Sequence, residues 1–170
     1  MSKRSEDVVV IDFETTAIHR RPHYPPSPVS MSVKYHGRKP VFYSWGHING
    51  GNNSTWAEAR QVLADIWASN KQVLFHNGKF DLKVANVHFG LPTPAWKRIH
   101  DTMLLLFLDD PRQTELSLKP AAKRLLGIEP DEQDAVANWL IQNQPVPGVK
   151  ISKARGPNYF GAFISYRPGD

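Results

Sequence analysis

The sequence predicts an α/β fold for a chain of 170 residues. Three observations carry this prediction: a β-branched run near the N-terminus, three strand patterns in succession, and a later alternation of strand and helix patterns. The length fits one domain with its own hydrophobic core. We therefore expect residues 1–170 to form a single domain.

The first three predicted elements are strands. Residues 8–14 form an apolar run with no polar break before Asp12, which is typical of a central strand buried on both faces. Residues 20–28 contain four prolines, so they form a loop that leads to a strand at residues 29–35. A third strand is expected at residues 40–45, which are aromatic and apolar. The three strands follow one another in meander order.

The remaining elements alternate between helices and short strands. A helix capped by Ser54 or Thr55, with Glu58 reaching back to the cap, carries one apolar stripe. Glycines mark the ends of two later helices, because glycine is the usual C-cap residue. The later elements are expected at residues 71–77 (strand), 79–89 (helix), 98–101 (strand), 102–108, 117–126 and 131–143 (helices), followed by a loop or extended segment at 149–170.

Composition and charge exclude several classes of function. The chain has no cysteine, so it has neither disulfides nor thiolate zinc sites, and a reducing cytoplasm is its simplest location. Its strongest apolar run, residues 103–108, is far too short to span a bilayer. The formal net charge of +5 favours a polyanionic partner such as a nucleic acid. We expect a cytoplasmic monomer with no membrane association.

The first candidate site residues are Asp12 and Glu14, at the end of the first strand. The period of a strand points these two carboxylates to the same side of the sheet. Two like charges at the edge of a core are tolerated when a divalent cation lies between them, and Mg²⁺ and Mn²⁺ prefer oxygen ligands. The alternative is a carboxylate that points into solvent or caps a turn, which is the commoner outcome for an isolated Asp-x-Glu.

The second candidate group lies where a strand turns into a helix. Asn77 and Asp81 are four residues apart and share one face of that helix, whereas Phe80 lies on a neighbouring face. We expect Phe80 to be buried and Asp81 to be open to the site. The alternative makes Asn77 an ordinary N-cap and Asp81 a solvated acid in the first turn.

Taken together, these motifs resemble the 3′–5′ proofreading exonuclease domain of phage-like family A DNA polymerases, within the DEDD superfamily. Residues 12–15, Asp-Phe-Glu-Thr, resemble the first exonuclease motif, and residues 77–81, Asn-Gly-Lys-Phe-Asp, resemble the second. Residues 101–105 and 116–127 resemble the segment that comes next in these domains and in the ribonuclease D group. The combination is far more specific than any single motif.

The resemblance implies a ribonuclease H-like fold, with a five-stranded mixed sheet of three antiparallel and then two parallel strands flanked by helices. It implies that Asp12, Glu14 and Asp81 bind two ions of Mg²⁺ or Mn²⁺ for hydrolysis of the terminal phosphodiester. It also implies a set of residues that contact the 3′-terminal nucleotide. For His76 in this set, the alternative is a structural role as a packed side chain. These residues are Thr15, Ile18, His76, Asn77 and Phe80.

The family's third motif is Tyr-x-x-x-Asp on one helix, and its acid completes the metal site. Tyr166 and Asp170 match the letters of this motif. Pro168 removes a helical hydrogen bond between them, and Gly169 weakens what remains. We therefore expect the working motif downstream of residue 170, in a domain truncated before its last catalytic helix. The alternative assigns the catalytic pair to Tyr166 and Asp170.

The expected function is removal of nucleotides from DNA 3′ ends by a proofreading-type, metal-dependent exonuclease. Its expected partners are a single-stranded DNA 3′ end and a polymerase domain in the native gene product, of phage or bacterial origin. Two alternatives remain open. One is a catalytically impaired nucleic-acid-binding fragment, and the other is an exoribonuclease of the ribonuclease D type.

Overall fold

The computed structural model describes residues 8–16, 18, 22–47, 51–128, 138 and 141–142. The chain divides into two compact units, which are considered separately below. Unit 1 comprises Met1–Gly46 and Asn52–Thr102, and unit 2 comprises His47–Gly51 and Met103–Asp170.

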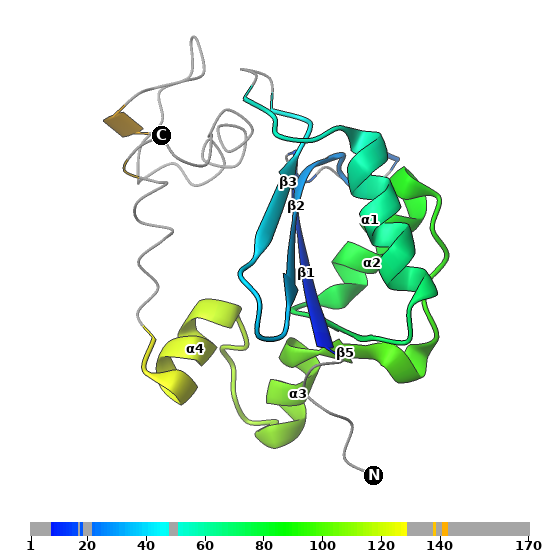
Figure 1. The fold of residues 1–170 in the computed structure, drawn as a ribbon. Helices are drawn as coiled ribbons and strands as arrows, with labels where there is room; N and C mark the ends of the chain where they lie inside the picture. Colours follow the sequence, from blue (N-terminus) through cyan, green and yellow to red (C-terminus); the bar gives the residue numbers. More distant parts are fainter. Residues whose placement is uncertain are drawn as a thin grey trace. The chain divides into compact units, whose positions relative to one another are not determined.

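The described elements follow the predicted order, and their ends lie within two residues of the expected ones. The addition is a short 3₁₀ helix, η2, ahead of the last strand. Along the chain (Figure 1) the elements are β1 (Val8–Thr15), β2 (Pro28–Tyr35), β3 (Val41–Ser44), α1 (Trp56–Ala68), β4 (Gln72–Phe75), α2 (Gly78–Phe89), η2 (Trp96–Arg98), β5 (Ile99–Asp101), α3 (Thr102–Asp109) and α4 (Leu118–Leu126).

The described strands of unit 1 form one sheet in the order β3-β2-β1-β4-β5. β1 pairs antiparallel with β2, and β2 pairs antiparallel with β3. On its other edge β1 pairs parallel with β4, which pairs parallel with β5. This arrangement confirms the predicted mixed sheet of three antiparallel and then two parallel strands.

The central strand β1 is buried on one face. Its odd-numbered residues from Val9 to Phe13 are buried, whereas its even-numbered residues from Val10 to Glu14 are exposed. The prediction of burial on both faces was therefore wrong. A run of valines cannot separate the two cases, because β-branched side chains suit either face of a pleated strand. Asp12 and Glu14 lie on the same face, as their spacing predicts.

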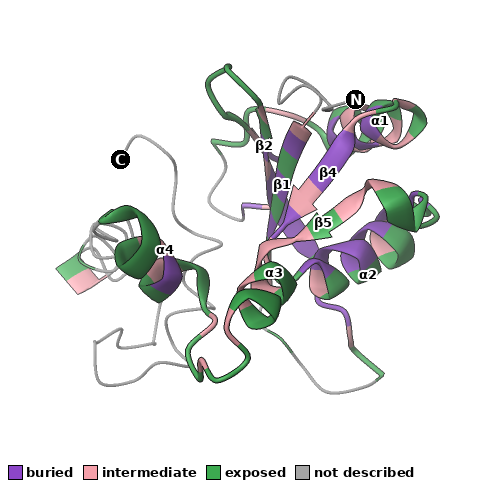
Figure 2. Cartoon of the chain, turned by 90° about the horizontal axis from the view of Figure 1, so that it is seen from below, coloured by how far each residue is buried: buried purple, intermediate pink, exposed green. Residues whose placement is uncertain are grey.

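Helices α1 and α2 cover the buried face of the sheet (Figure 2). They also contact each other: Arg60 Nε of α1 donates to the Phe89 carbonyl of α2 at 2.9 Å, and the Trp56 ring stacks on Phe89. The core between these layers consists of Val9, Ile11, Phe13, Met31, Val33, Ala59, Leu63, Ile66, Val73, Phe75, Leu82, Val84, Ala85, Phe89 and Leu91. This packing fixes α2 against the sheet, and α2 carries one of the candidate ligands.

The helix ends follow the local chemistry of the sequence. Thr55 caps α1 through its hydroxyl, which accepts the Glu58 N–H at 3.2 Å, and the Glu58 carboxylate accepts the Thr55 N–H at 2.7 Å. The predicted capping box is thus confirmed. Gly90 and Gly127 end α2 and α4 in the left-handed conformation, as expected for glycine C-caps.

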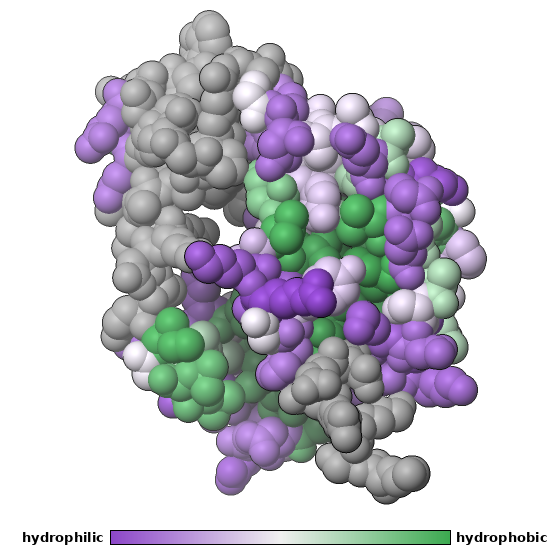
Figure 3. Space-filling view, viewed as in Figure 1, coloured by the Kyte–Doolittle hydropathy of each residue, from purple (hydrophilic) through white to green (hydrophobic). Residues whose placement is uncertain are grey.

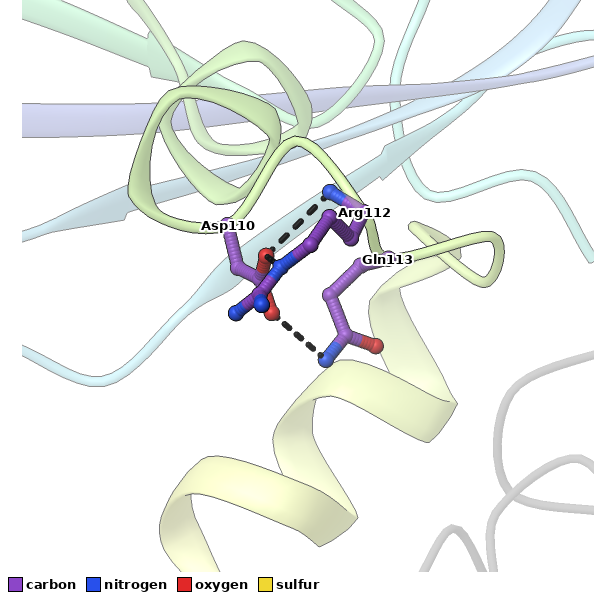
Figure 4. Close-up of polar contacts among 3 residues, drawn as sticks. All are labelled: Asp110, Arg112 and Gln113. Atoms are coloured by element: carbon purple, nitrogen blue, oxygen red, sulfur yellow. Dashed lines mark hydrogen bonds and ion pairs between the residues drawn. The ribbon is translucent and has the colours of Figure 1, made fainter.

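Unit 2 contains α3 and α4, joined by a short polar turn. Asp110 organises this turn (Figure 4): its carboxylate accepts the Arg112 N–H at 3.2 Å and the Gln113 side-chain amide at 3.3 Å. These bonds, led by that from the Arg112 side chain, hold the pKa of Asp110 below its usual value. Apolar side chains gather on the surface over α4 (Figure 3), and the exposed ones on that helix are Leu118, Leu125 and Leu126.

Some predictions fall on residues that the structure does not describe. Of the helix expected at residues 131–143, only residues 138, 141 and 142 are described, and all three are helical. Tyr166, Asp170 and the segment expected at 149–170 lie outside the described residues. The single, truncated domain stays a prediction. None of the described helices is long and apolar enough to cross a membrane.

Candidate active site

The candidate residues lie at the carboxyl ends of parallel strands. β1 and β4 are neighbours in the sheet, but the chain leaves β1 toward β2 on one side and leaves β4 toward β5 on the other. In open α/β sheets such a switch in direction opens a crevice outside the strand ends, where ligands bind. Asp12 and Glu14 lie toward the end of β1, and α2 with Asp81 begins just after β4.

Asp81 connects α2 to the end of β1. The pairing between β1 and β4 ends at Val10 and Leu74. Beyond that point the Phe13 N–H donates to Asp81 Oδ1 at 3.2 Å, across 68 residues of sequence. A carboxylate from the helix thus takes the place of a strand partner, and it anchors the first turn of α2 at the strand end.

Asp81 is the most strongly perturbed acid among the described residues with a resolved shift. Its side chain is 3 % exposed. Burial, followed by the negative charge of Asp12, raises the pKa of Asp81 to about 7, against the opposing effect of the Phe13 N–H. Asp81 faces the end of β1, where the site was expected, and its carboxylate is buried because it turns inward to accept the Phe13 N–H.

Asp12 is the charged group that raises the pKa of Asp81 most. Partial burial raises the pKa of the Asp12 carboxyl, and the positive charge of a protonated His76 opposes that shift. The two aspartates therefore repel each other, and the burial of Asp81 limits how far water screens this repulsion. A divalent cation between the two carboxylates removes this repulsion, and oxygen ligands are those that Mg²⁺ and Mn²⁺ prefer.

The carboxylates of Asp12, Glu14 and Asp81 are chemically suited to a divalent metal ion, but they are not already arranged around one point. Glu14 lies on the same face of β1 as Asp12, two residues further along. Within the described part of the chain, no three His, Asp or Glu side chains already converge on one point. The pair Asp12 and Asp81 forms the core of the candidate site, and Glu14 lies within the same strand end.

His76 and Asn77 lie in the turn between β4 and α2. His76 Nδ1 is 2.8 Å from the hydroxyl of Thr102 at the start of α3, and the charge of His76 acts on Asp12. Asn77 is the exposed N-cap of α2, with a φ of 65° in the left-handed region. Both residues thus lie beside the crevice, and their contacts with a nucleotide stay a prediction.

Phe80 is partly buried rather than fully buried, contrary to the expectation. It packs on the edge of the core, and its ring centroid lies 6.5 Å from that of Tyr24. The helix turns Asp81 inward toward β1, which leaves Phe80 at the margin of the site. Tyr24 belongs to the proline-rich loop, so this loop flanks the start of α2.

Thr15 and Ile18 follow the acidic strand end. The Thr15 hydroxyl donates to the Thr16 carbonyl at 3.0 Å, and Ile18 is 68 % exposed. An exposed isoleucine beside the strand end is compatible with the expected contact with the 3′-terminal nucleotide. Its role stays a prediction.

The sequence analysis missed Thr102 and Tyr24 as neighbours of the site, and it gave Asp101 only as part of the motif at residues 101–105. Asp101 and Thr102 bond to the turn that carries His76 and Asn77. The signal was the sheet order, because β5 runs parallel to β4 and its carboxyl end lies at the same edge. The position of Tyr24 near the site could not be predicted, because a residue in a loop belongs to no periodic pattern.

Comparisons with known proteins identify the family of the chain and agree with its fold. A family model described as 3′–5′ exonuclease matches residues 2–152. Among solved structures, NrnC of Brucella melitensis with bound Mg²⁺ is similar at a TM-score of 0.55 and 20% identity, covering 94% of this chain and 67% of that one. A comparison with curated proteins finds no match.

Two further solved structures share the fold at lower identity. Trypanosoma brucei RNase D in complex with GMP has a TM-score of 0.58 and 12% identity, and it covers 97% of this chain and 52% of that one. The Aedes aegypti Nibbler EXO domain has a TM-score of 0.55 and 8% identity, with coverages of 93% and 72%. The chain thus spans about half of the RNase D chain, and the ribonuclease H-like fold is confirmed.

The family match covers most of the chain, and the fold agrees with it. Proteins of this family use divalent metal ions, and the carboxylates of Asp12 and Asp81 are oxygen donors of the kind that such ions prefer. The chain belongs to the 3′–5′ exonuclease family.

Proposed function

We propose that this chain is a catalytic domain that removes nucleotides one at a time from the 3′ end of single-stranded DNA. The polymerase-type motifs at residues 12–15 and 77–81 support a proofreading role beside a polymerase domain. The net charge of +5 supports a polyanionic substrate. We further propose that the domain acts in the cytoplasm of a bacterial or phage-infected cell.

The observation that carries this proposal is the pairing of Asp12 with Asp81 at the switch point of the sheet. The negative charge of Asp12 and burial together raise the pKa of Asp81 to about 7. A pKa raised in this way shows that the ionised carboxylate is unstable without a nearby cation. Acids with such shifted pKa values are typical of functional sites.

Asp12, Asp81 and Glu14 would hold Mg²⁺ or Mn²⁺. When bound as a pair, such ions lower the pKa of a water nucleophile and stabilise the leaving 3′-oxygen. The chain's own groups set the geometry: the Phe13 N–H fixes Asp81, and α2 is held on the sheet by its core packing. His76 lies beside the acidic pair, and its charge acts on Asp12.

An exoribonuclease is the second candidate function. NrnC and RNase D share this fold, and the RNase D structure contains GMP. Their identities to this chain are 20% and 12%, so the similarity supports a shared fold and does not distinguish a DNA substrate from an RNA substrate. A DNA substrate rests on the polymerase-type motifs instead.

The test uses a 5′-labelled single-stranded DNA oligonucleotide and an RNA of the same sequence, each incubated with the protein and Mn²⁺. We expect a ladder of products that shorten from the 3′ end, faster on DNA, and no products when EDTA is present. Asp12→Asn should abolish the ladder. Asp65→Asn is the matched control, since Asp65 is an exposed acid on α1 and the change in charge is the same.

The outcomes separate the candidates. A faster ladder on RNA supports the exoribonuclease. Salt-sensitive binding of both oligonucleotides with no shortening supports a catalytically impaired binding fragment. Shortening by the wild-type protein and by Asp12→Asn at equal rates contradicts the proposed site.

A further inference from the structure

The carboxylate of Asp101 holds the first amide groups of α2. Its Oδ1 accepts the Asn77 N–H at 3.0 Å, and its Oδ2 accepts the Gly78 N–H at 2.8 Å. Asp101 ends β5, 23 residues after Gly78. The start of α2 is thus tied to a different strand, by a negative charge placed where a helix N-terminus favours one.

Thr102 holds the same turn from the next position. Its hydroxyl donates to the Phe75 carbonyl at 3.1 Å and lies 2.8 Å from His76 Nδ1. A hydroxyl carries one proton, which goes to Phe75, so His76 Nδ1 must be the donor in the second bond. Thr102 therefore fixes both the backbone of the turn and the orientation of the His76 ring.

The β4–α2 turn, residues 75–78, has little room to relax. Asn77 has a φ of 65°, in the left-handed region that non-glycine residues seldom adopt. A Cβ at Gly78 would come within 2.7 Å of Phe75 Cβ. Such a conformation persists only where surrounding contacts hold it, and Asp101 and Thr102 provide those contacts.

The β4–α2 turn leads directly to Asp81. Asp81 lies in the first turn of α2, and its Oδ1 accepts the Phe13 N–H at 3.2 Å. One helical turn is rigid, so a displacement of its start moves Asp81 by a similar distance. We propose that Asp101 and Thr102 are positioning residues that hold Asp81 against β1. This inference rests on the proposed function, since it concerns the same site.

Asp101 carries a negative charge that a helix cap does not require. Serine or asparagine caps a helix without a negative charge. Asp101 instead adds a further charge that contributes, after burial and Asp12, to the raised pKa of Asp81. A carboxylate suits this position because its two oxygens accept two adjacent N–H groups, which fixes the turn in position and in angle.

Amide hydrogen exchange of the metal-free protein tests the proposal directly. Asp101→Asn keeps the shape of the side chain but leaves it one acceptor oxygen. We expect exchange at Asn77 or Gly78 to accelerate about tenfold, the size of one lost hydrogen bond. We also expect the Phe13 amide to accelerate, because its acceptor Asp81 loosens with the turn.

The Phe13 amide separates positioning from capping. Acceleration at Asn77 or Gly78 with an unchanged Phe13 amide would overturn the proposal, because Asp101 would then cap α2 without acting on Asp81. Asp65→Asn is the control for the loss of a negative charge and should leave all three amides unchanged.

Thr102 provides a second, milder pair of variants in case Asp101→Asn fails to fold. Thr102→Val removes the hydroxyl and keeps the shape, so the Phe13 amide should accelerate, and Thr102→Ser should restore the wild-type rate. An unchanged Phe13 amide in Thr102→Val would contradict the proposal.

A kinetic measurement adds a readout on the reaction. With Mn²⁺ and a labelled oligonucleotide, Thr102→Val should lower kcat by about 10- to 100-fold, the size expected for a misplaced catalytic group, with little change in KM. If the wild-type protein cleaves nothing, the proposed function fails, and the exchange experiment still decides the positioning role because it requires neither metal nor substrate.

Discussion

At the scale of single residues, the site depends on Asp81, whose ionisation the folded structure disfavours. Asp81 is buried and lies near Asp12, and its pKa is raised to about 7 from 3.8. The folded protein without metal thus binds a proton that the unfolded chain releases. Stability of the metal-free protein should therefore fall as the pH rises from about 4 to about 7.

Asp81→Asn removes this penalty, because an amide does not ionise and still accepts the Phe13 N–H. In EDTA at pH 8 we expect the variant to be more stable than the wild type by a few kcal/mol, since one pKa unit corresponds to about 1.4 kcal/mol. At pH 4 the two should agree closely. Urea denaturation at both values checks this.

The control for this experiment is Asp65→Asn, which removes an exposed acid from α1. Its stability should follow the wild type at both pH values. The residue-scale account is wrong if Asp81→Asn also follows the wild type at pH 8.

The identity of these acids could be predicted from the sequence, but the burial of Asp81 could not. The two-residue spacing of Asp12 and Glu14 fixed their common face, because a strand alternates. Helical periodicity placed Asp81 near the site without giving the tilt of α2. Its inward turn depends on the Phe13 N–H, which is 68 residues away in sequence and is available only where β1 and β4 cease to pair.

At the scale of elements, the β4–α2 turn determines where the site lies. Gly78 is the first residue of α2, where alanine would usually favour the helix by about 1 kcal/mol. A Cβ at this position would lie 2.7 Å from Phe75 Cβ and 2.9 Å from its ring. The close approach of helix and strand should therefore outweigh the gain in helix propensity.

Gly78→Ala should destabilise the protein by about 1–3 kcal/mol, the usual cost of overpacking. Lys83→Ala, at an exposed position of the same helix, should change stability by less than about 0.5 kcal/mol. Urea denaturation of both variants provides the comparison. A Gly78→Ala variant as stable as the wild type would show that the turn relaxes easily.

Element boundaries were largely readable from local chemistry. The capping box at Thr55 and the glycines at 90 and 127 gave helix ends that the structure confirms. The turn at residues 75–78 was harder to predict, because its backbone is held by Asp101 at the end of β5 and by Thr102 at the start of α3. A motif read along the chain does not contain such a contact.

At the scale of the whole molecule, the order of strands brings the site together. Residue patterns predicted three strands in meander order, but they did not say that β4 adds beside β1 rather than beside β3; that arrangement came with the family resemblance. With the order β3-β2-β1-β4-β5, the carboxyl ends of β1, β4 and β5 meet at one edge of unit 1. The acids and the turn that positions them all lie at these ends.

We expect Asp12 and Asp81 to bind one divalent cation together. Calorimetric titration of the protein with Mn²⁺ tests it most directly. Binding should be tighter at pH 8 than at pH 6, because Asp81 must lose its proton to become a ligand. At pH 8, Asp12→Asn and Asp81→Asn should each weaken binding by at least about tenfold, as expected for a lost charged ligand, and Asp65→Asn should leave it unchanged. Mn²⁺ binding of wild-type strength by either Asp12→Asn or Asp81→Asn would contradict the shared site.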